Sequence, residues 1–95
     1  MTVKRYRVAG RVQGVGFRAF VARRAGALEI DGWVRNLDDG TVEALVEATR
    51  DVHREFERIL REGPRFSEVQ LVLATDEVDP APVGAGFIIA RDGPS

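Results

Sequence analysis

Two spacings of apolar residues alternate along the chain and predict its fold. Over residues 5–12, apolar or small residues alternate with arginines, the period of two expected of a strand with one solvated face. From Phe17 to Leu28 the apolar residues recur every three or four positions, which predicts a helix. Two further strands are expected over 32–36 and 41–48, joined by a short hairpin loop in which Asp-Asp-Gly supplies the turn.

The second half of the chain repeats this order. Thr49 is expected to cap a second amphipathic helix, which ends at Gly63-Pro64. The only histidine, His53, is expected at the surface of this helix, off its apolar stripe. An apolar alternation of Val69, Leu71 and Leu73 predicts a fourth strand, and GFIIA near the end of the chain predicts a fifth.

This order of elements, βαββαβ, predicts an α+β fold. An antiparallel sheet with two helices on one face satisfies it, as in the ferredoxin-like plait. Residues 1–95 are expected to form a single domain, because a chain of this length has no room for a second core. The fold by itself does not predict an activity, since many unrelated functions share it.

Composition narrows the classes of function. The net charge of −1 favours neither nucleic acid nor an anionic membrane as a partner, so any anion site must be local. The absence of cysteine excludes thiol chemistry and cysteine metal sites. No apolar run approaches the length of a membrane span, and we expect a cytoplasmic protein.

The segment GRVQGVGFR, residues 10–18, predicts an anion site. It leads from a strand into a helix through Gly14 and Gly16, where the backbone is free to curl and its N–H groups have no intrahelical partners. Converging N–H groups at a helix N-terminus attract an anion. Arg18 adds a guanidinium fork that matches phosphate oxygens, and a bound anion would explain a cation so near a helix N-terminus.

Three other interpretations of this segment are possible. Two glycines alone are compatible with a tight turn that leaves Arg18 a solvated surface charge. The run Gly14–Ala19 also fits G-x-G-x-x-A, but the chain is too short for a doubly wound dinucleotide-binding sheet. A plait that binds single-stranded RNA would need aromatic residues on its open face, whereas Tyr6 shares its face with Val8.

A second segment, GWVRNLDDGTVE over residues 32–43, favours the anion site over these other interpretations. Together with GRVQGVGFR it closely resembles the two signature segments of the acylphosphatase family, G-R-V-Q-G-V-x-F-R and G-W-V-x-N-x-x-x-G-x-V. The resemblance continues through the segment 52–60, Gly63-Pro64 and the terminal phenylalanine strand, and so covers nearly the whole chain.

The resemblance implies hydrolysis of acyl phosphates to a carboxylate and inorganic phosphate, with no metal, no cofactor and no covalent intermediate. It implies that Arg18 and the backbone amides of Gly14, Val15, Gly16 and Phe17 bind the phosphoryl group, and that Asn36 positions the attacking water. The partners expected are a small-molecule acyl phosphate and inorganic phosphate, the latter as product and competitive inhibitor. We expect a monomer that binds neither nucleic acid nor membrane.

The chemistry of these residues is compatible with that activity. Fixed donors stabilise the charge that phosphoryl transfer spreads over the equatorial oxygens, and a carboxylate leaves without a strong general acid. Asn36 is neutral, so it can orient a water without repelling a dianion. By itself Asn36 would pass for a turn residue. A non-catalytic module that binds phosphate or acyl phosphate, like the acylphosphatase-like domain of larger carbamoyl-transfer proteins, ranks second, and an RNA-binding plait is a distant third.

Four other features near these segments are not expected to take part in the chemistry of the site. Asp38 and Asp39 are expected to form a turn, and Arg35 is expected on the strand face opposite Asn36, without contact to substrate. Trp33 is expected to pack against or cover the sheet. Glu29 replaces the glycine that the family pattern has just past the first helix, so either Glu29 adopts a left-handed conformation or the helix ends elsewhere.

Overall fold

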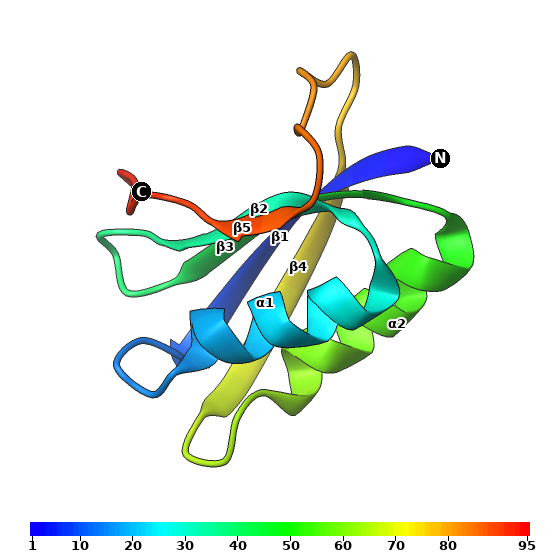
Figure 1. Cartoon of the computed structure of the whole chain (residues 1–95). Coiled ribbons are helices and arrows are strands. Elements are labelled where there is room, and N and C mark those ends of the chain that lie inside the picture. The colour runs from blue at the N-terminus through cyan, green and yellow to red at the C-terminus, as the bar shows by residue number, and fades with distance from the viewer.

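The computed structural model describes residues 1–95 and contains a five-stranded sheet with both helices packed on one of its faces (Figure 1). The elements, in chain order, are β1 (Thr2–Arg11), α1 (Phe17–Leu28), β2 (Asp31–Asn36), β3 (Val42–Ala48), α2 (Arg50–Glu62), β4 (Glu68–Asp76) and β5 (Phe87–Ile89). The strands lie in the order β4-β1-β3-β2-β5. The predicted ferredoxin-like α+β plait is confirmed.

The sheet is not fully antiparallel as expected, because strand β5 runs parallel to its neighbour β2. The pairs β1–β3, β1–β4 and β2–β3 are antiparallel, but β5 pairs parallel with β2. The reason is the connection over residues 77–86, which leaves β4 at one edge of the sheet and crosses its end to the other edge (Figure 1). The chain therefore enters β5 from the end at which β2 begins, and the sheet is mixed.

The core lies between the sheet and the two helices. It comprises fifteen buried residues, among them Tyr6 and Val8 of β1, Phe17 of α1 and Phe56 of α2. The rings of Tyr6 and Phe56 are 5.3 Å apart, and Phe87 of β5 packs 5.9 Å from Phe56. The apolar faces that the period of two and the helical period predict for β1 and α1 are the buried ones.

The prediction of a surface position for His53 is wrong. His53 is only 2 % exposed, because it follows the spacing i, i+3, i+7 with Phe56 and Leu60 and so shares the buried stripe of α2. Both ring nitrogens have partners: Nδ1 lies 2.8 Å from the Tyr6 hydroxyl, and Nε2 lies 2.8 Å from the Thr2 carbonyl oxygen. His53 therefore links α2 to the start of β1.

Strand β4 forms where the alternation predicts it, but with a different face buried. Val72 is buried, whereas Leu71 and Leu73 are 48 % and 53 % exposed on the sheet face away from the helices. The register shifts between Ala9 and Gly10, so that Gln70 is left unpaired and the alternation changes phase. The bulge forms in the pairing of β4 with β1, so the apolar pattern of β4 alone could not predict it.

The helix ends follow the local chemistry that the sequence predicts. The Thr49 hydroxyl accepts a hydrogen bond from the Val52 N–H at the start of α2, and α2 is followed by Gly63. Glu29 ends α1 in the left-handed conformation, with φ of 55°, which decides between the two alternatives left open for it. In the β2–β3 turn the Asp39 carboxylate accepts hydrogen bonds from Thr41, as expected of a turn residue.

Candidate active site

The glycine loop between β1 and α1 presents unused backbone donors at a helix N-terminus. Gly14 and Gly16 have φ of 74° and 78°, left-handed values that disfavour residues with a side chain. None of the backbone or side-chain hydrogen bonds uses the N–H groups of residues 14–17 as donors. Since Gly16 is the N-cap of α1, these donors lie at the positive end of the helix dipole.

Gln13 attaches this loop to the β2–β3 turn. Its side-chain amide donates to the Leu37 carbonyl at 2.8 Å and to the Thr41 carbonyl at 2.9 Å. The two signature segments are thereby joined by direct hydrogen bonds. The sequence interpretation missed this role, although Gln13 is the one uncharged polar side chain of GRVQGVGFR.

Asn36 lies at the end of β2 with an unsatisfied polar atom. Its side-chain Oδ1 is buried and has no hydrogen-bond partner within the protein. Because side chains alternate along a strand, Asn36 shares with the buried Val34 the face that packs against the helices. Buried polar atoms without partners are rare in folded proteins, and they are often found where a ligand or water binds.

These groups meet in one cleft of about 250 Å³. Gly14, Gly16, Phe17, Arg18 and Asn36 all line it. The remaining lining residues are Val12, Ala19 and Ile89. Of the residues predicted for the site, only Val15 is absent from the lining, because its side chain packs against the core. The cleft therefore combines a fixed positive charge, unpaired amides and a carboxamide, with apolar side chains beside them.

Arg18 has a partner that the sequence did not indicate. Its Nη1 donates to Oδ1 of Asp92 at 3.1 Å, across 74 residues of sequence. Asp92 belongs to the segment after β5, which runs beside β2: the Ala90 N–H donates to the Val34 carbonyl, and the Gly93 N–H to the Asn36 carbonyl. No local signal identifies Asp92, because only the course of the chain after β5 brings it to Arg18.

Arg35 lies on the opposite face of the sheet, as its position in the strand predicts. It pairs at 2.8 Å with Glu43, which also pairs with Arg5 at 2.8 Å, and its guanidinium lies 4.8 Å from the centre of the Trp33 ring. Burial alone would raise the pKa of Glu43, but the hydrogen bonds from the two arginines outweigh it and lower that pKa below its usual value. This network stabilises the open face and does not reach the cleft lining.

Two other kinds of site are not found in the structure. No group of three or more His, Asp or Glu side chains is arranged to hold a metal ion. None of the helices combines the length and the apolar character that crossing a membrane requires.

Comparison with known proteins gives one consistent family. The family model described as Acylphosphatase matches residues 4–89, which include both signature segments. The chain belongs to the acylphosphatase family. It is 50 % identical over 86 residues to an acylphosphatase of Pseudomonas aeruginosa, covering 88 % of this chain and 90 % of that protein. An acylphosphatase of Nitratidesulfovibrio vulgaris is 46 % identical over 84 residues, covering 88 % and 82 %. The prediction of an acylphosphatase enzyme is confirmed.

Solved structures of other proteins agree with the fold. The crystal structure of acylphosphatase from Bacillus subtilis has a TM-score of 0.88 at 38 % identity and covers 95 % of this chain and 99 % of its own. Full-length HypF in its phosphate- and nucleotide-bound form also matches, with a TM-score of 0.83 at 26 % identity over 98 % of this chain. The match covers only 12 % of the HypF chain, so the plait recurs there as a small part of a larger protein.

Proposed function

We propose that this acylphosphatase hydrolyses its substrate by direct attack of water on a phosphoryl group bound by Arg18 and the backbone amides of residues 14–17, with Asn36 orienting the water. The proposal is supported by one observation above all. Arg18, Asn36 and residues of the loop with unpaired N–H groups line the same cleft, and the buried Oδ1 of Asn36 has no partner within the protein.

Each group in the cleft has a role that its chemistry permits. The amides and the guanidinium donate hydrogen bonds to the phosphoryl oxygens, which bear the negative charge in the transition state. Asn36 Oδ1 accepts a hydrogen bond from the water, whose oxygen is thereby directed at phosphorus. The neutral carboxamide does this without adding a negative charge beside the dianion.

The reaction balances without a further reactant. The water oxygen forms a bond to phosphorus while the bond from phosphorus to the acyl oxygen breaks. The acyl oxygen leaves with its electron pair as a carboxylate, and both water protons remain on the released phosphate as H₂PO₄⁻. A carboxylate is a good leaving group, so no general acid is needed. Inorganic phosphate offers the same oxygens to the same donors, and we expect it to inhibit competitively.

Two substitutions separate the roles of Arg18 and Asn36. With benzoyl phosphate as substrate, we expect R18Q to raise both KM and the inhibition constant of phosphate by about tenfold or more, since hydrogen bonds to charged groups are the stronger ones.

We expect N36A to lower kcat by about a hundredfold or more while phosphate still binds. R23Q, on an exposed position of the same helix, is the matched control and should resemble the unsubstituted protein.

The same assay tests the rest of the proposal. Phosphate release should persist in EDTA, and loss of activity on chelation would overturn the metal-free step. Turnover no faster than the uncatalysed reaction would instead favour a module that binds acyl phosphate without hydrolysing it. Near-normal kcat in N36A would show that Asn36 does not orient the water.

A further inference from the structure

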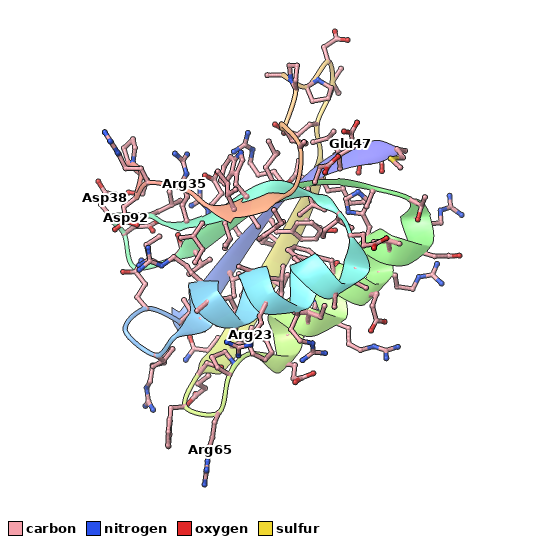
Figure 2. All side chains as sticks on the ribbon, viewed as in Figure 1. Arg23, Arg35, Asp38, Glu47, Arg65 and Asp92 are labelled. Atoms are coloured by element: carbon pink, nitrogen blue, oxygen red, sulfur yellow. The ribbon has the colours of Figure 1, made fainter.

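The arginine expected to bind the phosphoryl group is already paired with a carboxylate. Arg18 Nη1 and Asp92 Oδ1 are 3.1 Å apart, and no second contact between the two side chains is found. The guanidinium has five N–H donors, so one contact leaves most of them available. Figure 2 shows Asp92 at the same end of the molecule as Asp38 of the β2–β3 turn.

The position of Asp92 is fixed by its neighbour in the chain. The Gly93 N–H donates to the Asn36 carbonyl at 3.0 Å, and the Gly93 carbonyl accepts from the Asp38 N–H at 3.1 Å. These bonds tie the backbone beside Asp92 to the end of β2, where Asn36 lines the cleft. The backbone next to Asp92 is therefore anchored at the end of β2, from which its carboxylate reaches Arg18.

A carboxylate at this position lowers the affinity of the cleft for an anion. It is a fixed negative charge close to the place where a dianion must bind, and it occupies a donor of the guanidinium. The two side chains are 37 % and 63 % exposed, so solvent screens the pair and its strength is modest. A phosphoryl group that accepts a hydrogen bond from this Nη1 must displace the Asp92 carboxylate, and that displacement lowers the affinity for the anion.

We propose that Asp92 is a positioning residue that competes with phosphate for Arg18, and so weakens retention of the inorganic phosphate product. The inference rests on the role proposed above for Arg18. In the free protein Asp92 holds the Arg18 guanidinium beside the cleft. After hydrolysis, Asp92 again accepts the hydrogen bond from Arg18 Nη1 as phosphate leaves.

The test is D92N, which keeps an oxygen that accepts from Arg18 and removes the charge. By isothermal titration calorimetry with inorganic phosphate, we expect Kd to fall by about two- to fivefold, the range of an exposed ion pair. KM for benzoyl phosphate should fall by a similar factor without a rise in kcat. The effect on Kd should shrink as the salt concentration approaches about 1 M, where the screening length falls to about 3 Å. D92E, which restores the carboxylate, should return Kd toward its original value.

The matched control is E62Q. Glu62 pairs at 3.0 Å with Arg24, another arginine of α1, and the two side chains are similarly exposed, but neither lines the cleft. E62Q should leave the phosphate Kd unchanged. Thermal unfolding of each variant checks that the fold is retained.

A phosphate Kd in D92N that is unchanged, or higher, overturns the inference; a higher value would mean that Asp92 assists binding. The outcome with R18Q distinguishes this failure from that of the proposed function. If R18Q weakens phosphate binding and D92N has no effect, only the role of Asp92 fails. If R18Q leaves phosphate binding intact, the proposed role of Arg18 fails, and the role of Asp92 fails with it.

Discussion

At the scale of single residues, the site combines two polar side chains in opposite situations. Arg18 is partly exposed and already paired, whereas Asn36 presents a buried oxygen without a partner. An exposed guanidinium can exchange one anionic partner for another at little cost. A buried carboxamide oxygen gains a hydrogen bond whenever water or a ligand reaches it. These two situations are what the proposed function requires: Arg18 would bind the anion transiently, and Asn36 would hold the attacking water.

His53 gives a residue-scale prediction about pH. Burial lowers the pKa of the imidazole below its usual value, and the smaller opposing effect of the hydrogen bond to Thr2 does not cancel it. The neutral ring is thus favoured in the folded state, and the unfolded state binds the proton more readily. Stability from this residue is complete above about pH 6.5, the usual pKa of histidine, and is lost as the pH falls through the lowered pKa.

We therefore expect the free energy of unfolding, measured with urea, to fall between pH 7.5 and 5.5. One proton limits the slope to about 1.4 kcal/mol per pH unit. H53Q should be less stable at pH 7.5 but should lose less stability over the same range. An equal pH dependence in both proteins would mean that another group causes it.

At the scale of elements, the site depends on how two turns are joined. The β1–α1 loop supplies amides and Arg18, the end of β2 supplies Asn36, and Gln13 connects them through the carbonyls of Leu37 and Thr41. Each turn forms from local chemistry, glycines in one and Asp39 in the other. Their relative position is set by the sheet, because β3 lies between β1 and β2 and pairs with both.

The end of α1 gives an element-scale prediction. Glu29 has φ of 55° and its N–H donates to the Gly26 carbonyl, a C-cap position that favours glycine. We expect E29G to raise the free energy of unfolding by about 1 kcal/mol, since a left-handed conformation costs other residues about 1–2 kcal/mol.

The control for this prediction is E29A, which removes the carboxylate but keeps Cβ. Urea denaturation should show stabilisation in E29G only. If E29A stabilises the protein equally, the cause is the glutamate side chain and the backbone strain is not relevant.

At the scale of the whole molecule, the last segment of the chain completes the site. The connection 77–86 crosses the end of the sheet to β5, and the residues beyond β5 run along β2 as far as the turn (Figure 1). This path brings Ile89 into the cleft lining and Asp92 to Arg18. Residues from both ends of the chain thus border one site.

A substitution in this last segment tests the connection. G93P removes the N–H that donates to the Asn36 carbonyl, and we expect kcat to fall by about tenfold or more, because small displacements of a positioning group are costly. The lost hydrogen bond accounts for about 1 kcal/mol of the loss of stability, and the contact of the new Cβ with Arg35, which G93A shares, adds to it.

G93A is the matched variant. It keeps the N–H but places a Cβ 2.5 Å from Arg35 Nη1, on the open face of the sheet. We expect a much smaller loss of kcat than in G93P. Equal losses in the two variants would indicate that the contact with Arg35, and not the hydrogen bond to Asn36, accounts for the effect.

The sequence by itself determined the elements and the chemical groups of the candidate site. The alternation around Tyr6 and Val8, the cap at Thr49 and the glycines before Arg18 depend on interactions within a few residues, so their signals are local. Arg18 and Asn36 were identifiable because each belongs to a dense segment with a family resemblance.

Only the tertiary structure decided which groups those elements bring together. The spacing of His53 from Phe56 and Leu60 places it on the buried stripe of α2, but its hydrogen-bond partners, Tyr6 and Thr2, lie some fifty residues earlier and only the fold brings them to it. The exposed face of β4 follows from a bulge in its pairing with β1, and the direction of β5 from the path of the chain across the sheet. The contact between Arg18 and Asp92 depends on the path of the chain through β5 and along β2. The spacing of apolar residues predicts which face of a helix or strand is apolar. Pairing between strands distant in sequence determines which residues that face contacts.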